Sequence, residues 1–432
     1  MDSLNKINRQ LSTTQVIALG FISAILIGAV VLSLPVSSAD GSFTPFIDSL
    51  FTSTTSVCVT GLVVVTTATH WSLFGKVVIL ILIQLGGLGI ISFTTGIMMV
   101  IGRRITLRDR MILEDALNLD TLKGLVRFLQ RIFKGTFMVE SIGAVCYSLV
   151  FIPQYGIIKG VWFSIFHSVS AFCNAGIDIL GENSLVPYVS NPWINIVTMG
   201  LIITGGIGFL VWWDITNNIK KMAQHEYTPK MAVKKLHIHS KIVIITTLCL
   251  VFGGALLIFA LEFNNPETIG NLSFFEKIQA SLFQSVVLRT AGFMTFSQAG
   301  MHGTSIIVCL FLMFIGGSSI STSGGIKTTT FSVLFLSTRA TIKGSPHLVV
   351  FNKTIPHKTV QKALAVTVVS FTALIIATFM LHLFEGGSLL DATFETTSAV
   401  ATVGLSRDFT ASMGIAGKII ITFCMYLGRI GP

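Results

Sequence analysis

The amino-acid sequence predicts an all-α membrane protein built from four tandem repeats, and three observations lead to this prediction. Of the 432 residues, 52% are hydrophobic and only 11% are charged, whereas a soluble domain has about 25% charged residues. Charge-free stretches long enough to cross a bilayer recur along the chain. A short motif that ends in Gly also returns at nearly constant intervals.

The charge-free stretches predict transmembrane helices, each of which needs about 20 apolar residues. They cover residues 10–39, 77–102, 242–261 and 363–381. The first stretch resembles a secretory signal because residues 37–39 read Ser-Ser-Ala. Its apolar part is longer than the roughly 7–15 residues of a signal peptide core, so we expect a permanent first span in contact with membrane lipid.

The distribution of basic residues predicts the orientation of the chain. Of the 29 Lys and Arg residues, 22 fall within residues 1–14, 102–134, 218–241 and 327–362. Short Lys- and Arg-rich loops face the cytoplasm, so we expect these segments and the N-terminus on the cytoplasmic side of the cell membrane. The connections expected outside carry the acidic residues Asp40, Asp48, Glu182, Glu262, Glu267, Glu385 and Asp391. Basic residues that alternate with spans form no single patch, which argues against nucleic-acid binding despite the net charge of +10.

Cysteine and histidine spacing gives no sign of catalysis. The six Cys and nine His residues form no paired spacing and no HExxH motif, so no disulfide framework, zinc site or organic cofactor is predicted. A membrane-embedded enzyme with His70 or His167 as a base is an alternative, but no nucleophile or acid completes such a site. We expect that the protein is not an enzyme.

The repeated motif divides the chain into four units. Its copies are TSTTSVCVTGL at 52–62, HSVSAFCNAGI at 167–177, FQSVVLRTAGF at 283–293 and ETTSAVATVGL at 395–405. Their glycines, Gly61, Gly176, Gly292 and Gly404, lie 112–116 residues apart. An apolar span and a short amphipathic segment precede each motif, and a second span follows. We therefore expect eight transmembrane helices and four re-entrant helices around one pseudo-fourfold pore, with units at 1–115, 116–235, 236–350 and 351–432.

Non-helical backbone at membrane depth is tolerated where it is buried in protein or lines a water-filled path. Four such loops around one axis would form a ring of carbonyl oxygens that replaces the hydration shell of a cation. Glycine permits the backbone dihedrals that this requires. Close helix packing is an alternative role for a single Gly, but four evenly spaced copies favour an ion filter. Its expected residues are Val59, Thr60, Gly61, Asn174, Ala175, Gly176, Thr290, Ala291, Gly292, Thr402, Val403 and Gly404.

With these motifs, nearly the whole chain resembles the superfamily of potassium transporters that contains the Trk and Ktr systems and plant high-affinity potassium transporters. The third-repeat sequence RTAGF and the absence of extra N-terminal helices are most similar to the membrane subunit of Ktr systems. The resemblance implies potassium uptake, possible stimulation by sodium, and potassium bound at the filter carbonyls with one Gly from each repeat. It also implies a homodimer on a cytosolic ring of nucleotide-binding regulatory subunits. A sodium-selective or sodium-coupled carrier that works without a ring is the alternative.

A glycine-rich interruption is expected in the sixth span. Residues 316–330 read GGSSISTSGGIKTTT, and each Gly destabilises a helix interior by about 1 kcal/mol relative to Ala, so the span should break. The resemblance implies that this segment is a gating loop below the filter. Its residues are Gly316, Gly317, Ser318, Gly324, Gly325 and Lys327. A packed kink with Lys327 at the cytoplasmic rim is the alternative.

Three further charged residues fall in apolar segments. The resemblance implies that Arg429 projects into the pore below the filter, whereas an arginine that reaches out from a helix end is the alternative. Arg289 is expected to turn behind the third filter stretch and bind an acid or backbone carbonyls, with Glu395 as a candidate partner. Glu140 either pairs with a neighbouring helix or marks an ion path.

Two features of the chain bear on its partners. It contains no GxGxxG motif after a strand pattern, so a nucleotide-binding domain is expected on a separate subunit. The basic segments 102–134 and 218–241 are candidate docking surfaces for that subunit. The chain stops three residues after Arg429, where members of the resembled family continue, so we expect a truncated or unusually short last helix.

Overall fold

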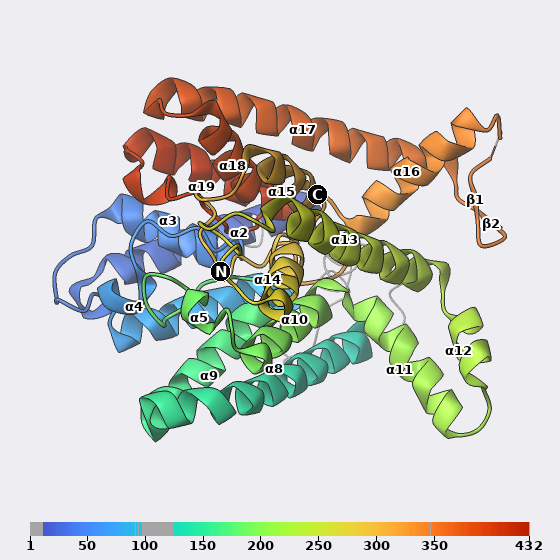
Figure 1. Ribbon diagram of the computed structural model, residues 1–432, viewed down its shortest axis with the longest axis horizontal. Helices are drawn as coiled ribbons and strands as arrows, with labels where there is room; N and C mark the ends of the chain where they lie inside the picture. Colours follow the sequence, from blue (N-terminus) through green and yellow to red (C-terminus); the bar gives the residue numbers. More distant parts are fainter. Residues whose placement is uncertain (1–11, 91, 94, 97–124, 346, 432) are drawn as a thin grey trace, which may run out of the picture.

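The computed structural model describes residues 12–90, 92–93, 95–96, 125–345 and 347–431. Most of these residues are helical (Figure 1). The strands among them form a small antiparallel hairpin of β1 (Val349–Val350) and β2 (Lys353–Thr354). The end of the expected span 77–102, most of the basic segments 1–14 and 102–134, and the boundary between the first two expected units lie outside the described residues.

Among the described residues, four long helices are apolar enough to cross a membrane: α2 (Thr13–Ser33), α8 (Leu125–Tyr155), α13 (Ile238–Glu262) and α17 (His357–Glu385). α2, α13 and α17 confirm the spans expected at 10–39, 242–261 and 363–381. α8 was not visible as a charge-free stretch because it contains Arg127, Arg131, Lys134 and Glu140. A bent helix pair makes a fifth candidate span among the described residues, and large apolar side chains face outward from these helices. The chain is an integral membrane protein.

A short helix follows each long helix. These are α3 (Phe46–Val57), α9 (Ile157–Phe172), α14 (Phe274–Val287) and α18 (Leu389–Val400), each of 12 to 16 residues. Each long helix packs more extensively on the short helix that follows it than on any other described helix. The last five residues of every short helix are buried, including their hydroxyl side chains. The short helices therefore form the centre of the molecule.

A further helix after each short helix joins one unit to the next. These helices are α5 (Leu73–Leu88), α10 (Pro192–Gly206), α15 (Gly303–Phe314) and α19 (Ile415–Ile430). α5 packs on α9, α10 on α14, α15 on α18, and α19 returns to α3. Because the last contact returns to the first unit, the packing order closes into a ring.

Two of these joining helices are interrupted. α10 is followed by α11 (Phe209–Ala223) at a bend of 101°, where Gly208 has a φ of +94°. α15 and α16 (Thr328–Ile342) are separated by residues 315–327, which confirms the break expected in 316–330. The sequence TGGIG at 204–208 carried a signal for the first interruption that the sequence analysis did not use.

Glycines let the joining helices approach the short helices closely. A Cβ on Gly86, Gly205 or Gly428 would meet the carbonyl oxygen of the last residue of α3, α9 or α18. Any larger residue would push the two helices apart at this point. The joining helices thus cross directly at the C-terminal ends of the short helices.

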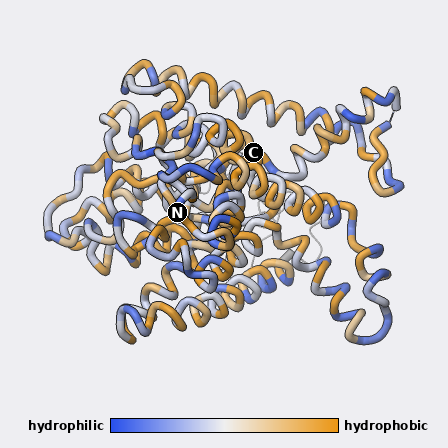
Figure 2. The backbone as a smooth tube through the Cα atoms, viewed as in Figure 1, coloured by the Kyte–Doolittle hydropathy of each residue, from blue (hydrophilic) through white to orange (hydrophobic). Residues whose placement is uncertain are grey.

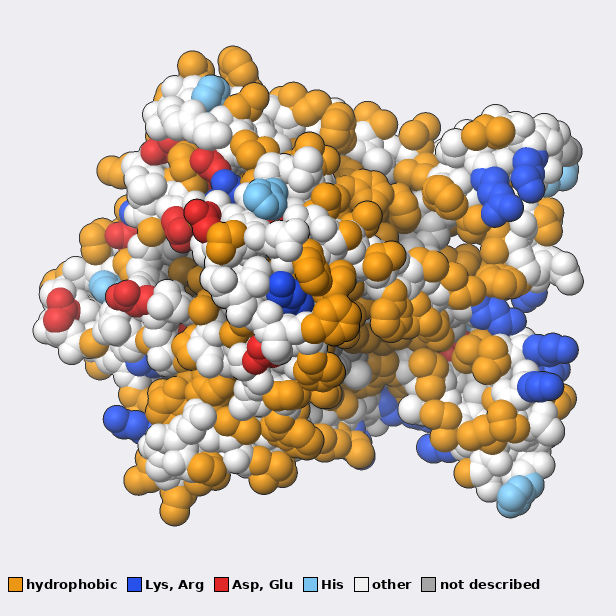
Figure 3. All heavy atoms as spheres, viewed as in Figure 1, with side chains coloured by type: hydrophobic (Ala, Val, Ile, Leu, Met, Phe, Trp, Pro, Cys, Tyr) orange, Lys and Arg blue, Asp and Glu red, His pale blue; other side chains and the backbone are white. Residues whose placement is uncertain are grey.

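The smaller helices of the described residues are η1 (Pro35–Ser37), α4 (Thr67–His70), η2 (Val186–Tyr188), η3 (Thr410–Ser412) and α12 (Pro229–Lys235). In Figure 1, α4 lies at the left end of the molecule and α12 at the right end. Figure 2 shows that hydrophobic residues are concentrated in the long helices and that hydrophilic residues lie toward their ends. In Figure 3, acidic side chains gather at the left end, and Lys and Arg gather at the right end over α11, α12, α16 and the hairpin. Charge is therefore separated along the long axis.

Candidate ion-binding site

The chain leaves each short helix in the same unusual backbone conformation. We call residues 58–62, 173–177, 289–293 and 401–405 the Gly segments. Their glycines have φ angles of +100° at Gly61, +65° at Gly176, +73° at Gly292 and +92° at Gly404. The residues two positions earlier also have positive φ, at +55° for Val59, +59° for Asn174, +70° for Thr290 and +53° for Thr402. Positive φ is uncommon outside glycine, so its recurrence at the same position shows that the four segments turn in the same way at these two residues.

The four Gly segments meet in a closed ring. A Cβ added to each glycine would have as its nearest neighbour the carbonyl oxygen of the residue that precedes the glycine of another segment. The pairs are Gly404 with Thr60, Gly61 with Ala175, Gly176 with Ala291, and Gly292 with Val403. Four backbone segments more than 100 residues apart in sequence therefore meet in one closed cycle of contacts.

Hydroxyl side chains in the short helices hold three of the segments. The Gly61 N–H donates to Thr55 Oγ1 at 2.9 Å and the Gly404 N–H donates to Ser398 Oγ at 3.0 Å. Ser170 Oγ donates to the carbonyl of Ile177 at 2.6 Å. Thr55, Ser170 and Ser398 each lie six residues before their glycine, where the third segment has Val286. The sequence analysis missed these residues, although the constant spacing was present in the motifs.

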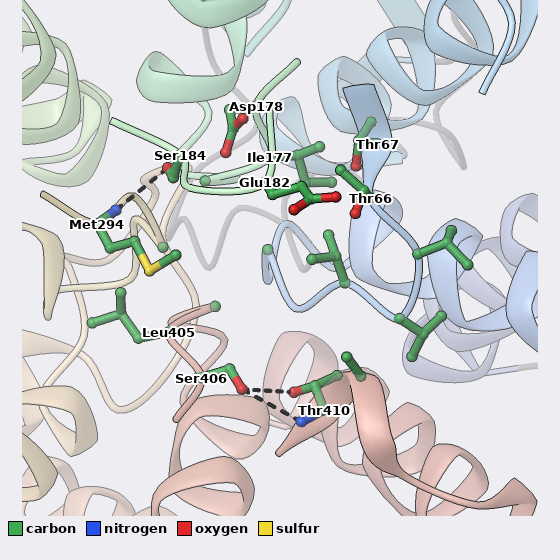
Figure 4. A pocket seen from close by; sticks show the side chains of 18 of the residues that line it. Thr66, Thr67, Ile177, Asp178, Glu182, Ser184, Met294, Leu405, Ser406 and Thr410 are labelled. Carbon is green, nitrogen blue, oxygen red and sulfur yellow. Dashed lines mark hydrogen bonds between the residues drawn. The ribbon is translucent and has the colours of Figure 1, made fainter. Parts of the chain in front are cut away.

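A cavity of about 230 Å³ opens above the ring and is lined by all four glycines. Asp178, Glu182 and Asp408 supply carboxyl groups to its wall, and none of its described lining residues is Lys or Arg. Figure 4 shows Asp178 and Glu182 on one loop, across the cavity from Ser406 and Thr410. The nearby Arg407 is turned elsewhere, because its Nε donates to Asp391 at 2.7 Å. The cavity wall is therefore electronegative.

The interruption between α15 and α16, residues 315–327, lies against the opposite side of the ring. Thr322 Oγ1 donates to the carbonyl of Phe172 and to Asn174 Oδ1, both at 3.1 Å, and Asn174 Nδ2 donates to Ser323 Oγ at 3.0 Å. A Cβ on Gly324 would meet the Thr402 side chain, and one on Gly325 would lie 2.9 Å from the Ala401 carbonyl oxygen. The interruption thus contacts the second and fourth Gly segments directly.

The interruption is also tied to the joining helices. The N–H groups of Ser318 and Thr322 donate to the carbonyls of Gly206 and Gly205, at 2.9 and 3.3 Å. Gly316 donates its N–H to the carbonyl of Ile326 at 2.9 Å, and Thr328 donates to that of Gly317 at the same distance, so the two ends of the interruption are held together. Ser318, Thr322 and Ser323 are buried.

Arg429 and Lys327 both bind carbonyl oxygens of this region. Arg429 Nη1 donates to the Thr322 carbonyl and Nη2 donates to the Gly86 carbonyl, each at 2.6 Å. Lys327 Nζ donates to the Ser323 carbonyl at 2.8 Å. Arg429 therefore points inward and links the interruption to α5, rather than reaching out from the helix end.

Arg289 and Glu395 do not pair. Glu395 instead accepts hydrogen bonds from the side chains of Ser406 and Thr410 and from the Arg407 N–H. Arg289 is buried, and its Nε has no hydrogen-bond partner among the described residues. The expected pairing was wrong because the loop after the fourth Gly segment folds back and supplies local donors to Glu395.

The whole chain matches a known family. Residues 8–432 match the TrkH family, which is described as cation transport protein. The chain is 41% identical to Ktr system potassium uptake protein B of Bacillus subtilis, over 97% of this chain and 91% of the relative. It is 39% identical to potassium/sodium uptake protein NtpJ of Enterococcus hirae, over 99% of this chain and 92% of the relative.

A solved structure supports the same fold. The potassium transporter TrkH from Vibrio parahaemolyticus superposes with a TM-score of 0.74, over 98% of this chain and 84% of that chain, at 18% sequence identity. The family consists of cation transporters, which supports the expectation that the protein is not an enzyme. From its apolar helices and these similarities, we conclude that the chain belongs to the TrkH family of cation transport proteins.

Proposed function

We propose that this protein carries potassium into the bacterial cell through the ring of the four Gly segments. The observation that carries the proposal is the cyclic contact of each glycine with the carbonyl that precedes another glycine. A ring of carbonyl oxygens replaces the hydration shell of a dehydrated cation. The proposed ligands are the backbone carbonyls at positions 59–61, 174–176, 290–292 and 402–404.

Further features of the ring suit a cation. The buried hydroxyls of Thr60, Thr290 and Thr402 have no hydrogen-bond partner among the described residues, so they are available to a passing ion or its water. All four short helices end just before a Gly segment, which brings the negative ends of their dipoles to the ring. Uptake is then driven by the membrane potential, which contributes about 2.3 kcal/mol per charge for each 100 mV.

The proposed architecture has eight transmembrane helices and four re-entrant short helices, in units at 1–115, 116–235, 236–350 and 351–432. The separation of basic and acidic ends supports this arrangement, with the basic end and the N-terminus in the cytoplasm. The electronegative cavity above the ring then faces outward and collects cations.

Residues 316–330 and Arg429 form the proposed gate. The contacts of Thr322, Ser323 and Gly324 with the Gly segments support a closed state in which this loop obstructs the path beneath the ring. Arg429 adds a positive charge there and fastens the loop to α5. Movement of the loop would open the path.

The names of the relatives support the choice of ion and partner. One is a potassium uptake protein of a Ktr system, and another is a potassium/sodium uptake protein. We propose a homodimer that is regulated by a cytosolic ring of nucleotide-binding subunits and docks through basic segments such as 218–241. Because the second name includes sodium, the competing function is a sodium-selective or sodium-coupled carrier that works without the cytosolic regulatory ring.

Substitution of one ring glycine tests the proposal. A Cβ at Gly61 would lie 2.5 Å from the Ala175 carbonyl oxygen, so Gly61→Ser should displace a ligand. We expect the intact chain to rescue growth at low potassium in a strain without its own uptake systems, and Gly61→Ser to lose that rescue. Potassium and sodium flux in proteoliposomes should show a lower potassium preference in the variant.

Gly200 provides a matched control, because a Cβ there would meet no atom within 4 Å. Gly200→Ser should retain both rescue and preference. A wild-type chain that carries only sodium would favour the competing function, and transport that is indifferent to Gly61 would refute the ring as the pathway.

A further inference from the structure

A buried carboxyl group, that of Glu140, contacts the second Gly segment through Cys173. Glu140 of α8 is 6% exposed. Its Oε2 accepts from Gln84 Nε2 at 3.3 Å, and its Oε1 accepts from Cys173 Sγ at 3.9 Å. Cys173 Sγ also reaches Gln84 Oε1 at 3.6 Å. The three side chains form one buried polar cluster, the Glu140 cluster, which joins α5, α8 and the second Gly segment.

The location of Glu140 separates it from the ion path. It lines an apolar crevice of about 400 Å³ between α5, α8 and α9, together with the outward-facing Ile81, Phe137 and Ile165. It does not line the cavity above the ring. The carboxyl group therefore approaches the ring from the lipid-facing side of the bundle.

Comparison of the repeats shows that packing does not require a carboxyl group at this position. Ser53, Ser168 and Ser285 occupy the same place in three short helices, since a Cβ on Gly28, Gly143 or Gly254 of the preceding long helix would meet their Oγ atoms. They donate to the main-chain carbonyls of Ile25, Glu140 and Val251, each three residues before that glycine. The first and third repeats thus place an aliphatic side chain where the second has Glu140. A buried carboxyl group is costly unless it is hydrogen-bonded, so its presence in one repeat calls for a local role.

Cys173, which contacts Glu140 from the second Gly segment, suggests what the role of the carboxyl group is. Cys173 is the first residue after α9 and caps it with a φ of −71°, and the next residue, Asn174, has a φ of +59°. The side chain of Cys173 is thus attached where the backbone turns from the helix into the ring. A Cβ on Gly87 would lie 2.6 Å from Cys173 Sγ, so the thiol is confined between α5 and Glu140.

We propose that Glu140 is a positioning residue, which fixes the second Gly segment through Cys173 and Gln84 and thereby helps to set the preference between cations. The inference rests on the proposed function of the ring. Loss of both carboxyl oxygens leaves the Gln84 amide and the Cys173 thiol without these acceptors, so the segment can shift. A displacement of carbonyl oxygens changes the fit to ions of different size.

The test compares potassium and sodium flux in proteoliposomes that contain equal amounts of folded full-length protein. Glu140→Val introduces the aliphatic side chain of the third repeat, and the potassium-to-sodium flux ratio should fall about tenfold, equivalent to about 1.4 kcal/mol. Glu140→Gln keeps a hydrogen-bonding side chain of the same shape and should retain the ratio within about twofold. Ile25→Val changes the equivalent position in the first repeat and should leave the ratio unchanged.

Cys173→Ala should lower the potassium-to-sodium flux ratio by the same factor. The double variant with Glu140→Val should show no further decrease in the ratio, because both substitutions break the same connection. A wild-type flux ratio in Glu140→Val or in Cys173→Ala would overturn the inference. Additive decreases of the ratio in the double variant would also overturn it, and so would a decrease in Glu140→Gln as large as that in Glu140→Val. If Glu140→Val does not fold, Cys173→Ala and Glu140→Gln decide the matter. Failure of the wild-type chain to carry potassium would instead refute the proposed function.

Discussion

At the scale of single residues, the hydroxyl-rich ends of the short helices have a definite structural purpose. Thr55, Ser170 and Ser398 bind the backbone of the Gly segments, where positive φ angles prevent regular helical hydrogen bonding. A side-chain oxygen can satisfy a buried N–H that the helix no longer satisfies. The same residues thereby hold the carbonyl groups of the ring in place.

Thr55→Val tests this role because it replaces the hydroxyl by a methyl group of similar size. The Gly61 N–H would lose its acceptor in a buried site, at a cost of about 1–3 kcal/mol. We expect a lower thermal unfolding temperature and a potassium-to-sodium flux ratio reduced by up to about tenfold. Detergent-solubilised protein gives the first quantity and proteoliposome flux gives the second.

Thr54→Val is the control within the same helical turn. Thr54 Oγ1 donates to the Leu50 carbonyl inside α3 at 2.7 Å, so its loss leaves the Gly segment intact. Equal effects of the two substitutions on the flux ratio would show that the Thr55 contact has no particular role at the ring.

At the scale of elements, the joining helices explain how a loop can lie beneath the ring. α10 bends by 101° before α11, and α15 stops at Phe314, which leaves space that residues 315–327 fill. The Phe209 N–H donates to the Ile320 carbonyl at 2.9 Å, so the bend and the loop support each other. Two irregular elements are therefore coupled.

Deletion of residues 318–323 should raise potassium flux. The deletion removes Thr322 and Ser323, and with them the contacts to Asn174 and the carbonyl that Arg429 binds. A hydrogen bond to a charged group contributes about 1.5–3 kcal/mol, so its loss alone should shift the open population about tenfold or more. Flux should be measured without any regulatory subunit.

A deletion of equal length at 348–353, in the exposed hairpin, controls for shortening of the chain. It should leave flux unchanged. A folded 318–323 variant with wild-type flux would show that the loop does not obstruct the path.

The elements also show what the sequence could predict. The breaks at 316–330 and at the four glycines were predictable because they depend on local backbone preference, and glycine carries that signal. The ring order of the helices depends on contacts between distant parts of the chain, which local sequence does not reveal. The contact of Arg429 with Thr322, for example, joins residues 107 positions apart. The Glu140 cluster was likewise beyond prediction, because Gln84 and Cys173 gain meaning only when α5 and α9 pack together.

At the scale of the whole molecule, the charge separation sets a direction for cations. The acidic end holds the cavity with Asp178, Glu182 and Asp408, and the basic end is formed by α11, α12, α16 and the hairpin (Figure 3). A cleft lined by one sign of charge concentrates ions of the opposite sign. The cavity should therefore raise the rate at which cations reach the ring from one side only.

Acidification of that side should slow potassium uptake, because burial raises the pKa of Asp178 to about 6. The carboxyl group is ionised at pH 7.5 and becomes neutral as the pH falls through about 6. Loss of one charge at about 8 Å in a water-like dielectric removes about 0.5 kcal/mol of attraction, so influx should fall about two- to threefold between pH 7.5 and 5. Uptake by whole cells at a fixed internal pH measures this step.

Asp178→Asn should abolish this pH dependence of the influx. The variant should show the low influx of the acidified wild type at both pH 7.5 and pH 5. A pKa raised in the folded protein means that the ionised carboxylate opposes folding above about pH 6, so the variant should be at least as stable as the wild type at pH 7.5. A lower influx is then due to the lost charge and not to unfolding. If the influx of Asp178→Asn still falls on acidification, a group other than Asp178 causes the fall. If the influx follows the internal rather than the external pH, the acidic end lies in the cytoplasm.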